Sequence, residues 1–344
     1  MDNFKNKTVL VTGATGLIGS NLVHKLMESN LTKVVVLARN KEKILNIFSD
    51  YLKYPNFKYI IQDITEPIKS QEKFDYIFHA AGSIAGDAIR NYPVDVINAN
   101  IQGTVNCLEY LKQKKHGRLI IFSSATVYGN ATGKNITVTE ADTTHTDSLD
   151  NPICAYSQSK RMAETLARAY HTQHNIDIVI ARFSYVFGYT KYYPNTAIFN
   201  FIQKALKGED IILTGTLFAR RDNIYVEDAI NMLLSVASNG NSGEAYNISS
   251  NGKSDNFAAI DEIAEEIVKS ANKIKKTSVS VIKKQFPDEQ REAGLILDNH
   301  KTLAITKLKE EDITNLSVAV SQTVHKYNVY LKKLQERATD INKQ

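Results

Sequence analysis

The chain has 344 residues, of which 43% are hydrophobic and 23% are charged, and its formal net charge is +5. This composition is typical of a soluble globular protein, and the length allows one large domain with a smaller one attached. The mild positive charge is spread along the chain without a basic block, which argues against a nucleic-acid-binding groove.

The two cysteines, Cys107 and Cys154, cannot form a disulfide framework. The first residues run into a strand without an apolar signal region, and no apolar run reaches the length of a membrane span. The eight histidines show no metal-ligand spacing. We therefore expect a cytoplasmic protein without a membrane segment, a nucleic-acid partner or a metal site.

Short β-branched runs alternate with longer amphipathic segments through the first half of the chain. The pattern predicts strands at 8–12, 33–38, 57–62, 74–80, 118–124, 176–183 and 244–249, and helices near 17–29, 41–53, 95–115 and 154–174. Apolar strands separated by helices are typical of a parallel sheet covered on both faces. The fold class that we predict is therefore α/β: a Rossmann-type doubly wound parallel sheet with a smaller mixed α/β substrate-binding lobe.

The rhythm breaks into shorter pieces beyond about Tyr185. We expect a dinucleotide-binding domain at 1–183, rejoined by about 224–250. The substrate-binding lobe would take 184–223 and 251–335, and 336–344 would be a tail. From His325 onward the sequence predicts a charged surface helix that frays at its end.

A glycine-rich stretch, "VLVTGATGLIGSNL", joins the first strand to the first helix. Glycines there permit a tight turn and let backbone N–H groups approach a pyrophosphate, while the helix N-terminus supplies positive potential. The GxxGxxG spacing between a strand and a helix predicts dinucleotide binding. The expected cofactor-binding residues of this loop are Gly13, Thr15, Gly16, Leu17, Ile18 and Gly19.

The second strand ends "VVVLARN", so that Ala38 stands where an acidic residue usually holds the adenosine ribose of NAD. Arg39 follows it. A guanidinium at this place suits a ribose 2′-phosphate, and we favour NADP over NAD on this ground.

Three residues are candidates for catalysis. Tyr156 and Lys160 in "YSQSK" are one helical turn apart, and Ser124 in "FSSATVYG" ends a predicted strand. A nearby ammonium would favour the tyrosinate and lower the pKa of the tyrosine from about 10. Ser124 would orient a substrate hydroxyl or carbonyl while Tyr156 moves its proton.

Eight motifs in order complete this pattern: "TGATGLIG", "QDIT", "FHAAG", "NIQGT", "SSATVYG", "YSQSK", "RRDNIYVEDA" and "YNIS". With them the chain, from Lys7 to about Leu308, resembles an extended short-chain dehydrogenase/reductase of the NAD-dependent epimerase/dehydratase family. The resemblance implies nucleoside-diphosphate-sugar substrates and a homodimer formed through the helices near 95–115 and 154–174.

The resemblance also assigns roles to matched positions. It implies that Ser124, Tyr156 and Lys160 are catalytic and that Lys160 also binds the nicotinamide ribose. The further cofactor-binding positions that it implies are Asp63, Ile64, Ala80, Ala81, Gly82, Asn100 and Phe183. The implied substrate-binding positions are Ser83, Ser124, Thr126, Tyr185 and Arg221, with Arg221 on the diphosphate and Arg291 as a further candidate for that clamp.

Some positions depart from the family pattern. Dehydratases of the family carry an Asp-Glu pair where this chain has Ala125 and Thr126, so 4,6-dehydration is not expected. Tyr185 replaces an asparagine of many members. Tyr128 is interpreted as a packing aromatic.

Three functions stay open. The first is an epimerase that oxidises and re-reduces a sugar carbon through Ser124, Tyr156 and Lys160. The second, favoured by Arg39, is an NADPH-dependent reductase of a keto nucleotide sugar or a related carbonyl. The third is a non-catalytic dinucleotide-binding protein, against which the complete Ser-Tyr-Lys set argues.

Overall fold

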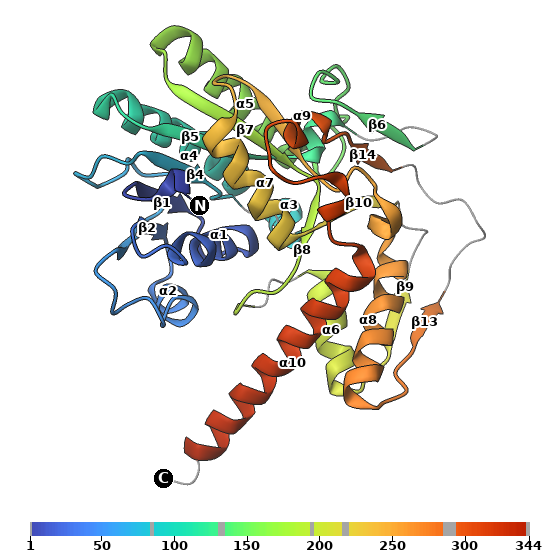
Figure 1. Cartoon of the computed structure of the whole chain (residues 1–344). Coiled ribbons are helices and arrows are strands. Elements are labelled where there is room, and N and C mark those ends of the chain that lie inside the picture. Colours follow the sequence, from blue (N-terminus) through green and yellow to red (C-terminus); the bar gives the residue numbers. More distant parts are fainter. Residues whose placement is uncertain are drawn as a thin grey trace.

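One parallel sheet forms the centre of the protein (Figure 1). The computed structural model describes residues 2–82, 86–129, 135–192, 196–214, 220–284 and 294–341. Seven strands pair in the order β11-β7-β5-β4-β1-β2-β3. They are β1 (Thr8–Thr12), β2 (Lys33–Ala38), β3 (Phe57–Ile61), β4 (Tyr76–His79), β5 (Arg118–Ser124), β7 (Asp177–Phe183) and β11 (Ala245–Ile248). The predicted Rossmann-type α/β fold is confirmed.

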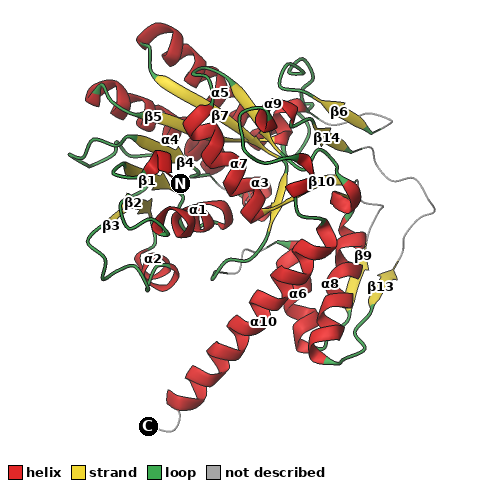
Figure 2. Ribbon diagram, in the orientation of Figure 1, coloured by secondary structure: helices red, strands yellow, loops and turns green. Residues whose placement is uncertain are grey.

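Helices cover both faces of this sheet (Figure 2). Helices α1 (Leu17–Met27), α2 (Lys41–Ile47) and α7 (Val226–Asn239) lie on one face, and α4 (Pro93–Lys114) and α5 (Cys154–His174) lie on the other. In β1, Val9 and Val11 pack with Leu22 in one core, whereas Leu10 packs with Leu111 in the second core. Burial on both sides explains why the strands are almost continuously apolar.

The strand order reverses between β1 and β4. The chain runs from β1 outward to β2 and β3, then returns to the other side of β1 as β4 and continues to β5. In open parallel sheets, ligands bind at such a switch point, outside the carboxyl ends of the strands. The glycine loop after β1 and the segment after β4 therefore lie at the expected place for a ligand.

The remaining elements form smaller sheets and a helical group beside the main sheet. The three small sheets are β8 (Tyr185–Phe187) with β10 (Arg221–Tyr225) and β12 (Phe257–Ala258), β9 (Ile211–Thr214) with β13 (Val281–Lys284), and β6 (Ile136–Val138) with β14 (Leu295–Leu297). The other helices are α3 (Gly86–Asn91), α6 (Ala197–Lys207), α8 (Ile260–Lys275), α9 (His300–Leu303) and α10 (Leu316–Ile341). Four 3₁₀ turns complete the elements: η1 (Asp2–Phe4), η2 (Ala125–Tyr128), η3 (Ser254–Asn256) and η4 (Glu310–Asp312).

The C-terminal helix α10 differs from the prediction. The sequence placed its start at His325, but it begins at Leu316. Leu316, Val320, Val324 and Tyr327 form a buried stripe, so the first turns belong to the core, while the far end projects away from the body (Figure 1). Within the described ranges, no helix is both long and apolar enough to cross a membrane.

Candidate active site

The glycine loop makes a close approach between the ends of β1 and β4. Gly13 has φ +62°, and a Cβ added to it would lie 2.6 Å from the carbonyl of Ala80. A Cβ on Gly19 would lie 2.5 Å from the Gly13 carbonyl oxygen. Both positions therefore require glycine for the fold of the loop itself. Thr15, Leu17 and Ile18 are half-buried around it; their predicted contacts with a cofactor remain predictions.

Gly16 is different from its two neighbours. Its backbone is extended, with φ −79° and ψ 174°, and the nearest atom to an added Cβ would be 3.4 Å away. Nothing inside the protein demands glycine here. Since Gly16 precedes the first turn of α1, a missing side chain suits a group that approaches the backbone from outside, as a pyrophosphate does.

Arg39 and Asp63 meet at the ends of β2 and β3. Arg39 Nη1 lies 3.5 Å from Asp63 Oδ2, and the Arg39 side chain is 79% exposed. Hydrogen bonds from Thr65 and the charge of Arg39 hold the pKa of Asp63 below its ordinary value. The side chain of Ile64 is buried in the core and its carbonyl accepts a hydrogen bond from Asn106; its place at an adenine remains a prediction.

The segment after β4 connects the loop to α4 and α5. Ala81 N donates to Thr12 Oγ1 at 3.3 Å, next to the buried His79. A Cβ on Gly82 would lie 2.5 Å from Asn100 Oδ1 and 3.5 Å from Lys160 Nζ. Three expected cofactor-binding positions, Gly82, Asn100 and Lys160, are thus neighbours.

Asn100 has one satisfied and one unsatisfied side-chain atom. Its Nδ2 donates to Ser159 Oγ at 2.9 Å, whereas its buried Oδ1 has no hydrogen-bond partner. A buried acceptor without a partner is costly, so this oxygen suits a donor supplied by a ligand or by ordered water. The open space at Gly16 and the unpartnered Oδ1 of Asn100 are both compatible with a dinucleotide bound at these strand ends.

Ser124 and Tyr156 meet at the carboxyl end of β5. Ser124 Oγ accepts from Thr126 N at 3.3 Å, and the Ser124 hydroxyl lies near enough to Tyr156 to affect its pKa. The sequence led us to expect a lowered tyrosine pKa. Instead, burial raises the pKa of Tyr156, and the Ser124 hydroxyl works against that rise.

Lys160 lies one turn after Tyr156 on α5 and is also buried. Its Nζ donates to the Phe122 carbonyl at 2.8 Å and lies 5.8 Å from the centroid of the Tyr156 ring. Burial lowers the pKa of Lys160 from 10.5 to about 8, and the charge of Glu164 opposes this. Tyr156 and Lys160 therefore lie close to each other as expected, but burial affects their pKa values more than the charge interaction between them that the sequence suggested.

The expected substrate-binding residues form two groups. Thr126 lies in η2 after Ser124, and its buried Oγ1 has no hydrogen-bond partner. Tyr185 and Arg221, on the paired strands β8 and β10, are stacked, with the guanidinium carbon 5.3 Å from the ring centroid. Phe183 ends β7 and packs against Phe122. Ser83 and Arg291 lie outside the described residues.

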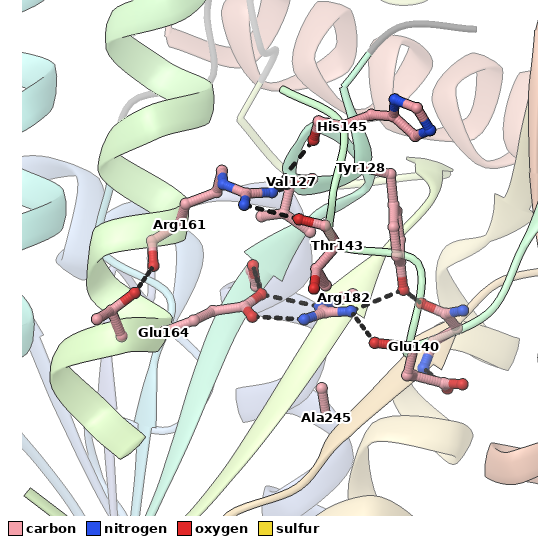
Figure 3. Close-up of polar contacts among 12 residues, drawn as sticks. Val127, Tyr128, Glu140, Thr143, His145, Arg161, Glu164, Arg182 and Ala245 are labelled. Atoms are coloured by element: carbon pink, nitrogen blue, oxygen red, sulfur yellow. Dashed lines mark hydrogen bonds and ion pairs between the residues drawn. The ribbon is translucent and has the colours of Figure 1, made fainter. Parts of the chain in front are cut away.

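A buried network beside the site was not predicted (Figure 3). Arg182 on β7 forms a bidentate ion pair with Glu164 on α5, and also donates to Tyr128 Oη and to the Glu140 carbonyl. Tyr128, interpreted as a packing residue, therefore also carries a polar contact. The signal in the sequence was an arginine inside the apolar strand "DIVIARF" and a glutamate one turn after Lys160.

Comparisons with known proteins identify the family. The sequence model of the NAD dependent epimerase/dehydratase family matches residues 9–249. The chain belongs to this family. UDP-glucuronic acid decarboxylase 6 of Arabidopsis thaliana is 30% identical over 276 residues, which cover 78% of this chain and 77% of that protein. The low-salt glycan biosynthesis protein Agl12 of Haloferax volcanii is 30% identical over 275 residues, 77% of this chain and 84% of that protein.

Solved members of the epimerase/dehydratase family share the fold. A dTDP-glucose 4,6-dehydratase from Bacillus anthracis in complex with NAD is 25% identical with a TM-score of 0.74, over 93% of this chain and 96% of that one. A UDP-glucuronic acid 4-epimerase from Bacillus cereus in complex with NAD is 25% identical with a TM-score of 0.73, over 95% of this chain and 99% of that one.

Proposed function

We propose that the protein is a nucleotide-sugar epimerase that uses a nicotinamide dinucleotide. The observation that carries the proposal is the meeting of Ser124, Tyr156 and Lys160 at the carboxyl edge of the sheet, beside the glycine loop. The relatives support the substrate class, because the decarboxylase, dehydratase and epimerase named above are all named for nucleotide sugars.

The residues would share the work as follows. A bound nicotinamide dinucleotide supplies hydride acceptance and donation. Tyr156 takes the proton of a sugar hydroxyl as that carbon is oxidised, and returns it when the carbon is reduced from the other face. Ser124, which lies beside Tyr156, would orient the reacting oxygen. Lys160 supplies positive charge that favours the ionised tyrosine.

The cofactor would lie along residues from three strand ends and from helix α4. Gly13, Gly16 and Gly19 would let the pyrophosphate approach the N-terminus of α1, and Asn100 Oδ1 would accept a hydrogen bond from the nicotinamide end. We propose NADP over NAD because the guanidinium of Arg39 is exposed at the ribose end. Asp63 Oδ2, 3.5 Å from Arg39 Nη1, would compete with the ribose 2′-phosphate for this guanidinium. The two solved relatives above are complexes with NAD.

A decarboxylase is the second candidate, because a relative at 30% identity carries that name. Decarboxylation begins with the same oxidation and would use the same three residues. Water elimination would need a further acid and base next to Ser124, where the chain has Ala125 and Thr126. A reductase would run the reduction alone and consume NADPH from solution.

The test is product analysis with the purified full chain. UDP-glucose, UDP-glucuronic acid and UDP-N-acetylglucosamine are supplied in turn, and products are identified by NMR and mass spectrometry. An epimerase gives an isomer of unchanged mass with no net absorbance change at 340 nm. A decarboxylase releases CO₂, and a reductase converts keto sugars while consuming NADPH.

The variant Tyr156→Phe tests the chemical role. We expect turnover to fall by roughly 10³-fold or more, because the proton-transfer group is lost while the ring stays. Tyr246→Phe is the matched control, since Tyr246 is also buried but lies on β11 with its hydroxyl bonded to Asn241 N. Unchanged turnover in Tyr156→Phe would show that Tyr156 is not the proton-transfer group, whereas a wild-type protein that binds the dinucleotide but turns over no substrate would be better described as a binding protein.

A further inference from the structure

The ion pair between Arg182 and Glu164 is the most enclosed pair of charges in the described part of the chain. The two side chains are 3% and 8% exposed. Arg182 Nε donates to Glu164 Oε1 at 3.0 Å, and its Nη2 donates to Oε2 at 2.7 Å. Ser123 Oγ adds a third hydrogen bond, to Oε1 at 2.5 Å. A buried ion pair in which both carboxylate oxygens accept hydrogen bonds is held in a fixed geometry. We call the group of Ser123, Glu164 and Arg182 the joint.

Each member of this joint is next to a residue of the proposed site. Glu164 lies one turn beyond Lys160 on α5. Ser123 precedes Ser124 on β5 and pairs in register with Arg182 on β7. The joint therefore connects the helix that carries Tyr156 to the strand that carries Ser124, close to the point where their side chains meet.

Arg182 extends the joint to the turn after Ser124. Its Nη1 donates to Tyr128 Oη at 3.0 Å, and Tyr128 in turn donates to Asn247 Oδ1 at 2.6 Å. Tyr128 ends η2, which begins directly after Ser124 (Figure 3). The strand end is thus held on both sides, through Ser123 before it and through Tyr128 after it.

Glu164 also has an electrostatic relation to Lys160. The titratable and charged groups that face Lys160 are Tyr156 and Glu164 on its own helix and His79 from β4; α4 contributes the neutral Asn100, and β5 contributes the Phe122 carbonyl. Burial keeps His79 neutral at ordinary pH, since it lowers the His79 pKa to about 3. Glu164 is therefore the group among them that supports a charged Lys160.

We propose that Glu164 and Arg182 are positioning residues of the Ser124–Tyr156–Lys160 site: their ion pair and the Ser123–Glu164 hydrogen bond hold helix α5 against strands β7 and β5, and Glu164 supports the positive charge of Lys160 one turn before it. This inference rests on the proposed function for its effect on turnover. Its effect on Lys160 does not depend on which reaction the protein performs.

The decisive variant is Glu164→Gln, which keeps the shape of the side chain and removes the charge. The titration of Lys160 is followed by NMR of protein labelled with [ε-¹³C]lysine, with the signal assigned by its loss in Lys160→Arg. We expect the Lys160 midpoint to fall by about one pH unit or more. The kcat should fall on the order of 10- to 100-fold, with its alkaline limb moved to lower pH, while KM stays within about twofold.

Ser123→Ala is the milder variant and keeps the test decisive if Glu164→Gln does not fold. It removes the tether from β5 while the ion pair remains, so kcat should fall about tenfold with the Lys160 titration unchanged. Asp177→Asn is the matched control, because the Arg118–Asp177 pair joins β7 to β5 at the amino ends of these strands, 2.8 Å apart. It should leave both readouts unchanged.

Two results would overturn the proposal. One is a wild-type Lys160 titration and kcat in folded Glu164→Gln. The other is an equal loss of kcat in Asp177→Asn, which would show that the loss of any ion pair made by β7 has the same effect. If Tyr156→Phe keeps its turnover, the proposed reaction fails, but the NMR titration still decides the relation of Glu164 to Lys160.

Discussion

Lys160 should cost the protein stability, and replacing it by methionine should recover part of that cost. The side chain is buried, and burial lowers its pKa from 10.5 to about 8. A depression of about 2.5 units corresponds to about 3 kcal/mol, at 1.36 kcal/mol per unit. This is the free energy by which the folded state disfavours the charged form relative to the unfolded chain.

Part of that gain is lost through the hydrogen bond that Lys160 makes. Its Nζ donates to the Phe122 carbonyl, which would be left without this donor. An unsatisfied buried acceptor costs about 1–3 kcal/mol. Methionine has a similar length and no charge, so it should fill the same space. The expected net result at pH 7 is that Lys160→Met is more stable than wild type by about 1 kcal/mol.

The difference should depend on pH in a defined direction. Because the folded-state pKa is below the unfolded value, the folded protein releases this proton first as pH rises. Between pH 8 and about 10.5 the unfolded chain binds more protons, so wild-type stability rises relative to Lys160→Met. Below pH 8 the full cost is present, and the advantage of the variant is largest.

Urea denaturation at pH 7, 8, 9 and 10 measures this difference, with equal m-values as the condition for comparing midpoints. Lys269→Met is the control, because the Lys269 side chain is 75% exposed and its removal should change stability by less than about 0.5 kcal/mol. A variant that is less stable than wild type at pH 7, with a difference that does not change with pH, would refute the reasoning. Activity should be lost in either case.

Two further predictions concern the cofactor groove. Gly13→Ala should destabilise the fold by about 2 kcal/mol in urea denaturation, since the φ of Gly13 is +62° and an added Cβ would meet Ala80. Gly16→Ala should cost less than about 0.5 kcal/mol of stability and weaken NADH or NADPH binding at least tenfold in a fluorescence titration. Equal destabilisation by the two substitutions would contradict this. Arg39→Ala should raise the Km for NADP at least about tenfold and leave that for NAD within about twofold, because only NADP carries the 2′-phosphate; an unchanged Km for NADP would remove the basis for preferring it.

The sheet could be predicted from the sequence because each strand is bounded by strong local signals. The strands at 33–38 and 118–124 have the predicted limits, since both are β-branched or apolar runs that end at polar or small residues. The start of α10 could not be predicted in this way. Leu316 and Val320 are separated by Ser317, Val318 and Ala319, so the apolar run does not mark one face, and only the packing of α10 shows that Val320 is buried while Val318 is exposed.

The site was predictable as a set of residues but not as an electrostatic environment. Spacing placed Tyr156 and Lys160 on one helical face, and the strand end placed Ser124 beside them. The pKa directions depend on burial, which the sequence does not give. The sequence therefore predicted a lowered pKa for Tyr156, whereas its enclosure raises that pKa.

The two ends of strands β5 and β7 show why the carboxyl edge differs from an ordinary part of the sheet. Strand β7 makes an ion pair at each end, with β5 at the amino end and with helix α5 at the carboxyl end. At the amino end, Arg118 and Asp177 are 19% and 42% exposed, so water still solvates them and the pair costs little to form. At the carboxyl end, Arg182 and Glu164 are 3% and 8% exposed, and the loss of hydration offsets much of their attraction. Stability alone would favour apolar residues there. In the proposed proton transfer, a fixed charge in this water-excluded place would act on Lys160 without reorganising during the reaction.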